Sequence, residues 1–250
     1  MRYDPKKHRL PVCGASGILL VNKPAMWTSF DVVNFVRARF NVPKVGHCGT
    51  LDPAATGLLV LVLGRFTAWS GRLSGDDKAY AGSMMLGVET DSGDLDGKVI
   101  RRCAELPTEE KIREVFAGFR GRSLQQPPMY SAVKVGGKKL YELARQGVEV
   151  DREPREIEIS RLEITGLRLP EVDFALDCSK GTYIRTLCTD IGRKLGCCAT
   201  LTALCRTRCG RFRLDDAVTV AELKGMEQGE FTAMMAEALV RQLKELEHES

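Results

Sequence analysis

The chain has 250 residues, of which 44% are hydrophobic and 28% are charged. This composition is typical of a globular protein with a core of good size, and no apolar run reaches the roughly 18 residues that a membrane span requires. The basic first residues have no apolar segment behind them, so we expect no secretory signal and predict a cytoplasmic protein. Nine cysteines without the close pairs of a zinc module indicate reduced thiols that serve as small apolar side chains, and no metal.

The net charge of +4 is unevenly distributed along the chain. Residues 1–50 carry eight basic and two acidic side chains, whereas residues 215–250 carry three basic and nine acidic ones. A basic body with an acidic tail fits a polyanionic partner, because phosphates that lysine and arginine neutralise release their counterions. We predict a basic extension over 1–15, a main domain over 16–214, and a short acidic extension with a helix over 215–250.

Strands separated by one helix are predicted for the N-terminal third of the chain. Apolar runs predict strands over 17–22, 58–63 and 80–88. Between the first two strands, Thr28 or Ser29 begins a helix, because a side-chain oxygen at this position accepts a hydrogen bond from the first turn. The expected buried face of this helix consists of Val32, Val33, Val36 and Phe40.

The run Gly46–Gly57 places one carboxylate, Asp52, in a turn framed by glycines and Pro53. His47 stands five residues before the aspartate, and an apolar stretch follows the turn. Glycines let a backbone approach a ligand closely and proline stiffens a turn, so this run can present Asp52 to a substrate from a rigid base. On these residues alone, a surface turn that Asp52 caps locally explains the pattern equally well.

The rest of the chain contains more strands than helices. The acidic loop 91–97 begins like a calcium loop, but Arg102 stands where the twelfth position needs glutamate, so we expect no calcium. Strict alternation over 172–178 predicts a strand, and Thr219 with Glu222 forms a capping box that opens a tail helix. These elements predict an α+β fold around a mixed, mostly antiparallel central sheet flanked by helices.

The strand over 172–178 leads directly into Ser179–Arg185. Thr182 is expected to cap a helix that ends before Gly196, which puts Tyr183 and Arg185 in the first turn. Backbone N–H groups and the positive end of the helix dipole both lie at such a position.

Three segments share polar side chains at the end of a predicted strand: His47 with Asp52, Lys78–Tyr80, and Ser179–Arg185. One carboxylate, tyrosine rings and an arginine make a poor metal site and lack a serine or cysteine nucleophile paired with histidine. They suit a reaction in which a flat ring stacks on tyrosine and the carboxylate attacks the bound molecule. The basic group keeps this carboxylate ionised. A nucleobase is the flat ring that a basic protein is expected to bind. Hydrolysis of a glycoside is disfavoured, because it uses a pair of carboxylates and only one is well placed here.

Seven sequence blocks in order carry a resemblance that covers roughly residues 16–214. The blocks are Gly17–Pro24, Gly46–Gly57, Lys78–Tyr80, Gly87–Gly97, Gln126–Lys134, Gly137–Gly147 and Cys178–Thr186. With these blocks the chain resembles the TruB-like family of pseudouridine synthases, which isomerise uridine 55 in the TΨC arm of tRNA. The resemblance implies the pseudouridine synthase fold and an isomerisation that needs no cofactor.

The resemblance also implies a role for each candidate site residue. Asp52 matches the catalytic aspartate, which attacks either the ribose or the pyrimidine ring, and Arg185 matches the arginine that pairs with this aspartate. The implied substrate-binding residues are His47, which positions the flipped nucleotide, Tyr80, which stacks on the base, and Tyr183 and Leu204, which line its pocket. Two departures stand out: Cys48 replaces the usual threonine, and Met26–Trp27 stands where the family normally has a glycine.

The implied partner is tRNA, bound through its TΨC stem-loop by a monomer, with no membrane and no metal. Bacterial members commonly append a small RNA-binding domain, which we expect to be absent because the acidic residues 215–250 are too few for it. One alternative is a related synthase that acts on other RNA or within a guide-RNA particle. The other is a non-catalytic RNA-binding or tRNA-folding module, which the presence of Asp52, Tyr80 and Arg185 disfavours.

Overall fold

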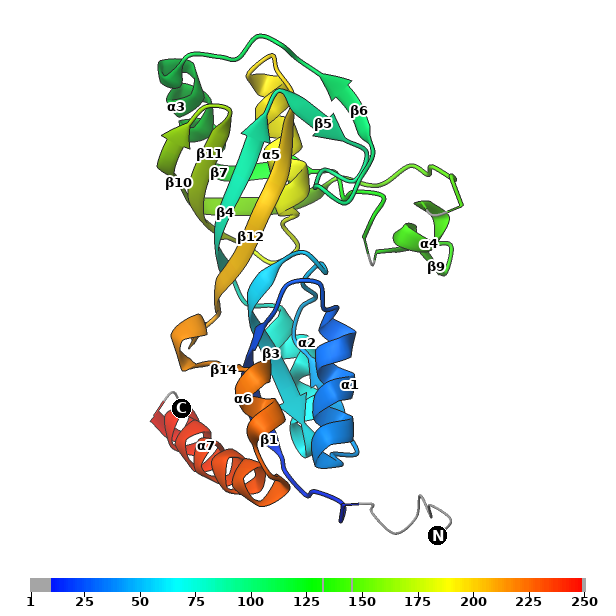
Figure 1. Cartoon of the computed structure of the whole chain (residues 1–250), viewed down its shortest axis with the longest axis vertical. Coiled ribbons are helices and arrows are strands. Elements are labelled where there is room, and N and C mark those ends of the chain that lie inside the picture. The colour runs from blue at the N-terminus through cyan, green and yellow to red at the C-terminus, as the bar shows by residue number, and fades with distance from the viewer. Residues whose placement is uncertain (1–9, 132, 145, 249–250) are drawn as a thin grey trace. The chain divides into compact units, whose positions relative to one another are not determined.

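The computed structural model describes residues 10–131, 133–144 and 146–248. The chain divides into two compact units, which we call the first unit (Met1–Asp76 with Arg206–Ser250) and the second unit (Asp77–Cys205). Strand β12 (Ala199–Cys209) carries the chain from the second unit back into the first (Figure 1). The first unit is therefore built from both ends of the sequence.

The first unit is organised around strands β1 (Gly17–Lys23) and β3 (Thr56–Leu63), which pair antiparallel along their length. Every residue of β3 from Gly57 to Leu63 is buried, so this strand forms the centre of the first unit. Short strands extend the sheet: β2 (Val45–His47) pairs with β3, β14 (Val218–Thr219) lies parallel to β1, and β13 (Phe212–Arg213) pairs with β12.

Helices from both ends of the chain pack in the first unit. In α1 (Ser29–Phe40), Thr28 and Asp31 form a capping box, and the predicted apolar face is buried. The tail forms two helices, α6 (Val220–Gly225) and α7 (Gln228–His248), where the sequence predicted one. Phe231 of α7 stacks on Phe40 of α1, with ring centroids 3.8 Å apart. The remaining helical segments of this unit are η1 (Gly64–Trp69), α2 (Ser70–Ser74) and η2 (Leu214–Asp216).

The second unit contains an antiparallel sheet in the order β4-β11-β10-β7. These strands are β4 (Lys78–Leu86), β7 (Gly121–Gln125), β10 (Arg155–Arg168) and β11 (Glu171–Cys178). The strict alternation predicted for β11 is confirmed, because Val172, Phe174 and Leu176 are buried. They join a core cluster to which α3 (Glu109–Ala117) and α5 (Ile184–Lys194) contribute.

Two hairpins complete the second unit. Strands β5 (Val88–Thr90) and β6 (Val99–Arg102) enclose the acidic loop. Strands β8 (Lys134–Val135) and β9 (Lys138–Lys139) form a hairpin, and α4 (Leu140–Ala144) follows. Figure 1 shows α4 and β9 on a long excursion from the sheet of this unit.

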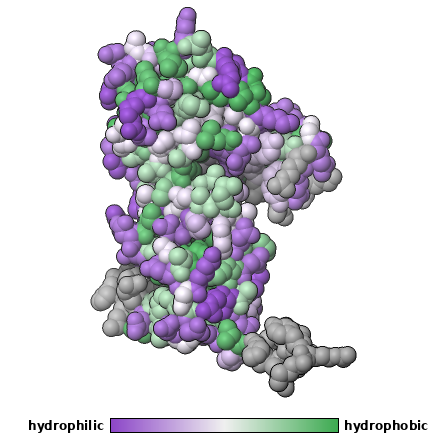
Figure 2. Space-filling model, in the orientation of Figure 1, coloured by the Kyte–Doolittle hydropathy of each residue, from purple (hydrophilic) through white to green (hydrophobic). Residues whose placement is uncertain are grey.

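The fold class is confirmed: helices flank a mixed sheet whose long pairings β1–β3, β4–β11 and β10–β11 are antiparallel and whose short β1–β14 pairing is parallel. One helix start is corrected, since α5 begins at Ile184 and Tyr183, not Thr182, is its N-cap residue. The Thr182 hydroxyl instead donates to the carbonyl of Ser179 at 2.9 Å. No helix within the described residues is both long and apolar enough to cross a membrane. Figure 2 shows hydrophilic side chains over much of the visible face, with hydrophobic ones interspersed.

The prediction that all cysteines are reduced is wrong for one pair, because Cys103 and Cys198 form a disulfide. The two residues are 95 positions apart in the sequence. They meet at Gly87, whose carbonyl accepts from the N–H of Cys103 (2.9 Å) and whose N–H donates to the carbonyl of Cys198 (2.8 Å). The other seven cysteines are free, and six of these are buried.

Candidate active site

The turn that carries Asp52 is held on both sides by the segment that begins α1. The Ser29 hydroxyl accepts a hydrogen bond from the N–H of Leu51 at 2.9 Å and lies 3.2 Å from the carbonyl of Leu51. On the other side, the N–H of Met26 donates to the carbonyl of Pro53 at 2.8 Å. The residues before and after Asp52 are thus both bound to one segment, which fixes the backbone from which the half-buried Asp52 projects.

Lys23 is completely buried beneath this turn. Its ammonium donates to three carbonyl oxygens, those of Trp27 (2.6 Å), Pro24 (2.9 Å) and Pro53 (3.1 Å). Burial lowers the pKa of Lys23 to about 8; the charge of Asp52 opposes this shift and that of Arg206 adds to it. These contacts show that Lys23 holds the Asp52 turn together.

Arg206, on β12, is the second buried cation of the turn, with 1% of its surface exposed. Its guanidinium donates to three carbonyl oxygens, those of Leu58 (2.8 Å), Gly49 (3.1 Å) and Thr50 (3.5 Å). The planar fork of arginine can reach several acceptors at once, so Arg206 links the turn to the start of β3.

His47 lies at the end of β2, on the same loop as Asp52 and half-buried. Burial and the charge of Arg206 lower the pKa of His47, while a backbone hydrogen bond with Gly49 opposes the shift. The imidazole is therefore neutral at pH 7, which suits a positioning role better than that of a cation.

The other four candidate residues lie in the second unit. Tyr183 is clamped at the start of α5 by the side chain of Gln125, whose oxygen accepts from the Tyr183 N–H (2.7 Å) and whose amide donates to the Tyr183 carbonyl (3.1 Å). Tyr80 on β4 and Leu204 on β12 are partly buried and pack against the same core cluster, to which α5 contributes. The structure thus brings Tyr80 and Leu204 to the border of one apolar core.

Arg185 is buried one residue into α5, with 5% of its surface exposed. Its guanidinium donates to the carbonyls of Tyr130 (2.7 Å) and Ser92 (3.0 Å), and its Nε lies 3.5 Å from a carboxylate oxygen of Asp94. The acidic loop between β5 and β6 therefore orients this arginine. Across the described residues, no cluster of histidine, cysteine, aspartate or glutamate has the arrangement of a metal site.

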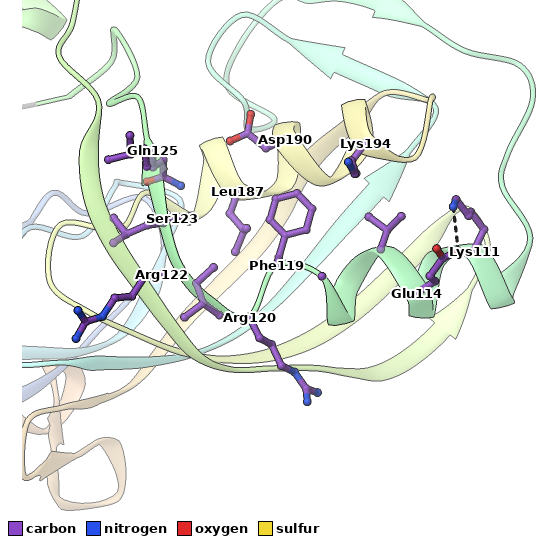
Figure 3. A pocket seen from close by; sticks show the side chains of 15 residues that line it. Lys111, Glu114, Phe119, Arg120, Arg122, Ser123, Gln125, Leu187, Asp190 and Lys194 are labelled. Carbon is purple, nitrogen blue, oxygen red and sulfur yellow. Dashed lines mark hydrogen bonds and ion pairs between the residues drawn. The ribbon is translucent and has the colours of Figure 1, made fainter.

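A cavity of about 440 Å³ lies elsewhere in the second unit, between α3, β7 and α5. Figure 3 shows Phe119 and Leu187 within it and Arg120 and Arg122 extending away from it. None of the six candidate residues lines this cavity, and its link to them is Gln125, which contributes to its wall. The cavity is thus distinct from the sequence-predicted site.

Comparison with known proteins identifies the family. The model for the N-terminal domain of the TruB family pseudouridylate synthases matches residues 37–184. The model for the tRNA pseudouridylate synthase B C-terminal domain matches residues 185–248. The chain belongs to the TruB family of pseudouridylate synthases.

Curated relatives agree with this assignment over most of their length. A protein of Opitutus terrae named tRNA pseudouridine synthase B is 49% identical over 211 residues, which cover 84% of this chain and 88% of the relative. A protein of the same name from Bordetella avium is 47% identical over 213 residues, covering 84% and 87%. Enzymatic formation of pseudouridine is therefore the activity of the family to which this chain belongs.

Solved structures show the same fold. A chain in the crystal structure of a Cbf5-Nop10-Gar1 complex matches 93% of this chain with a TM-score of 0.68 and 28% identity. A chain in the structure of an H/ACA RNP bound to a substrate RNA containing 2'-deoxyuridine matches 92% with a TM-score of 0.62 and 25% identity. This chain spans 63% and 66% of the lengths of those two chains.

Sequence reasoning missed the side chains that bind the Asp52 turn, Tyr183 and Arg185. Arg206 and Gln125 were not singled out, and Asp94 was noted only as part of the acidic loop 91–97. The available signal for Arg206 was weak: a basic residue directly after the largely apolar residues 199–205. Its partners are 148 to 157 residues away in the sequence, so no local pattern reveals them.

Proposed function

We propose that this chain converts uridine to pseudouridine at position 55 of tRNA, in the TΨC loop, with Asp52 as the nucleophile. The observation that carries the proposal is the fixation of Asp52 between Leu51 and Pro53, each hydrogen-bonded to the segment before α1 or to its first residue. A carboxylate on an immobile backbone suits an attack that needs a fixed geometry. Membership of the TruB family supports the reaction, and the names of the relatives support tRNA as the substrate.

The reaction proceeds on a uridine that has left the RNA stack, because the target atom is inaccessible within it. Asp52 attacks the ribose or the pyrimidine ring, the bond between N1 and C1′ breaks, and the uracil rotates. The bond to Asp52 then breaks and frees the carboxylate, a new bond joins C5 to C1′, the C5 hydrogen leaves as a proton, and N1 gains a proton. Because the reaction is an isomerisation, it requires no cofactor.

The remaining candidate residues act around this step in the proposal. Tyr80 stacks on the target base, Tyr183 and Leu204 line its pocket, and His47 positions the flipped nucleotide in its neutral form. Arg185 pairs with Asp52 and keeps it ionised. Burial of Arg185 and its bonds to two carbonyls and to Asp94 support a guanidinium that is already oriented before the substrate binds.

The TΨC stem-loop is the part of the tRNA that we propose is bound, by a monomer in the cytoplasm, where tRNA is available. We further propose that residues 16–214 form the catalytic domain and that 215–250 form an extension of it. The packing of Phe231 on Phe40 supports an extension that stabilises the catalytic domain.

The test is release of tritium from a TΨC stem-loop that carries [5-³H]uridine, because isomerisation replaces the C5–H bond. Wild-type protein is expected to release the label from position 55, and D52N is expected to release none while binding the stem-loop normally. D96N removes an exposed carboxylate from the second unit and serves as the matched control. Binding by wild type without release would identify a non-catalytic RNA-binding module, and full activity of D52N would refute the assignment of the nucleophile.

A further inference from the structure

Met26 combines a left-handed backbone with an exposed apolar side chain. Its φ is 65°, a conformation that glycine adopts readily and other L residues rarely. Its side chain has little cover from the rest of the protein, since 76% of the residue surface is exposed. The fold therefore gains little packing from a methionine at a position where glycine would be less strained.

A comparison within the chain makes this position unusual. Among the described residues, Asn41 is the other non-glycine residue with positive φ, at 49°. Asn41 has a structural reason: it is the C-cap of α1, asparagine tolerates this conformation, and its amide donates to the carbonyl of Leu10 at 2.7 Å. The backbone of Met26 serves the bond to Pro53, but that bond does not require a methionine side chain, and a residue held in a strained conformation beside a candidate nucleophile is a candidate functional position.

The position of Met26 relative to Asp52 indicates what the side chain contacts. The Met26 N–H binds the carbonyl of Pro53, and Ser29 binds Leu51, so the 26–29 segment borders the Asp52 turn on both sides. Phe30 follows directly in the first turn of α1 and is 58% exposed. A nucleotide that reaches Asp52 would bring its neighbours in the RNA toward the segment that carries these two apolar side chains.

We infer that Met26 and Phe30 form an apolar surface that packs against an unstacked nucleobase of the substrate next to the target uridine. The inference rests on the proposed function, in which the target uridine leaves the stack. A flipped nucleotide deprives its neighbours of a stacking partner, and polarisable or aromatic side chains can replace that contact. The ammonium of Lys224, exposed and 5.4 Å from the ring of Trp27, places a positive charge near this surface for the RNA backbone.

Two substitutions test the surface without straining the fold. M26N retains a residue that tolerates a positive φ but removes the apolar side chain, and F30Q removes the exposed ring. I100Q, at an exposed isoleucine of β6 in the second unit, is the matched control. Each variant is also made in the D52N background, so that binding is measured without turnover.

The stem-loop carries 2-aminopurine at the position next to the target uridine, because its fluorescence reports stacking. We expect M26N and F30Q each to raise the Kd for this RNA about tenfold, the loss typical of one stacking contact, and to change its fluorescence in the complex. The Tm of M26N should equal or exceed that of wild type. I100Q should leave the Kd and the fluorescence unchanged.

Failure of this inference differs from failure of the proposed function. If wild type releases tritium but M26N and F30Q bind and react like I100Q, the apolar surface has no role with RNA and the inference is wrong. If wild type releases no tritium from any tRNA arm, the proposed function itself is wrong, and the inference that rests on it is wrong as well. A self-association that M26N abolishes would assign the surface to a second copy of the chain and would also overturn the inference.

Discussion

At the scale of single residues, the candidate site depends on buried cations that bind carbonyl oxygens. Lys23 and Arg206 together bind six main-chain oxygens around the Asp52 turn. A buried carbonyl without a hydrogen-bond partner costs about 1–3 kcal/mol. The two side chains therefore stabilise a loop whose carbonyl groups have no partners in regular secondary structure. The charge of Arg206 also contributes to the lowered pKa values of His47 and Lys23.

Substitution K23M should destabilise the protein, and the cost should increase with pH. Burial depresses the pKa of Lys23 from 10.5 to about 8, so between these values the unfolded chain holds a proton that the folded chain has lost. Wild type therefore gains stability as pH rises in this window, by at most about 1.4 kcal/mol per pH unit, whereas the variant lacks this gain. Urea unfolding of both proteins at pH 7, 8, 9 and 10 measures the difference, and a pH-independent difference would contradict the assigned shift.

At the scale of elements, two side chains position the ends of strands and helices that carry the site. Arg206 on β12 connects the Asp52 loop to β3, and Gln125 at the end of β7 fixes the start of α5. In both cases a side chain supplies hydrogen bonds where the regular ladder of the element stops. The positions of the site residues therefore depend on side chains of neighbouring elements.

Substitution R206K should lower kcat about tenfold and change KM little, because the loop that presents Asp52 loses its fixed geometry. A lysine ammonium lacks the planar fork that reaches Leu58, Gly49 and Thr50 together. Steady-state kinetics on the stem-loop measure the effect. R213K, an exposed arginine on β13, is the control, and equal kinetics for both variants would mean that Arg206 has no positioning role.

Substitution Q125A should increase hydrogen exchange at the N–H of Tyr183, because that group loses its acceptor at 2.7 Å. Exchange measured by NMR should rise locally, while residues in the middle of α5 keep their protection. Q126A removes an exposed neighbouring amide that contacts Arg152 and should leave Tyr183 unaffected.

At the scale of the whole molecule, each unit has its own core. The core of the second unit is continuous in sequence from Asp77 to Cys205, whereas the first unit combines two distant segments. Helix α7 completes the first unit through the fully buried Phe231, which stacks on Phe40. The acidic tail, predicted only as an extension with a helix, thus contributes to the core of the unit that carries Asp52.

Substitution F231A should destabilise the first unit by about 3–5 kcal/mol, the usual cost of truncating a buried aromatic side chain. Hydrogen exchange followed by mass spectrometry should show lower protection in β1, α1 and α7. Protection in β10 and β11 should stay at the wild-type level, because these strands belong to the other core. A uniform loss across both units would instead show that they unfold together.

The sequence predicted those features whose causes are local. The helix start at Thr28 or Ser29, the capping box at Thr219, the alternation of β11 and the fully apolar β3 all follow from neighbours within a few residues, and all are confirmed. The Cys103–Cys198 disulfide and the partners of Arg206 were not predicted, because they join residues about a hundred or more positions apart. The roles of the six site residues remain predictions that the proposed experiments address.

The discontinuity of the first unit has a consequence for the newly made chain. During synthesis the loop with Asp52 leaves the ribosome long before Arg206, whose contacts with Gly49 and Thr50 span 157 and 156 positions. The second unit is contiguous and can acquire its core while the loop still lacks this support. A nascent or truncated chain that ends before β12 therefore carries Asp52 without the contacts of Arg206, and we expect the Asp52 turn to reach its final geometry only once β12 has been made.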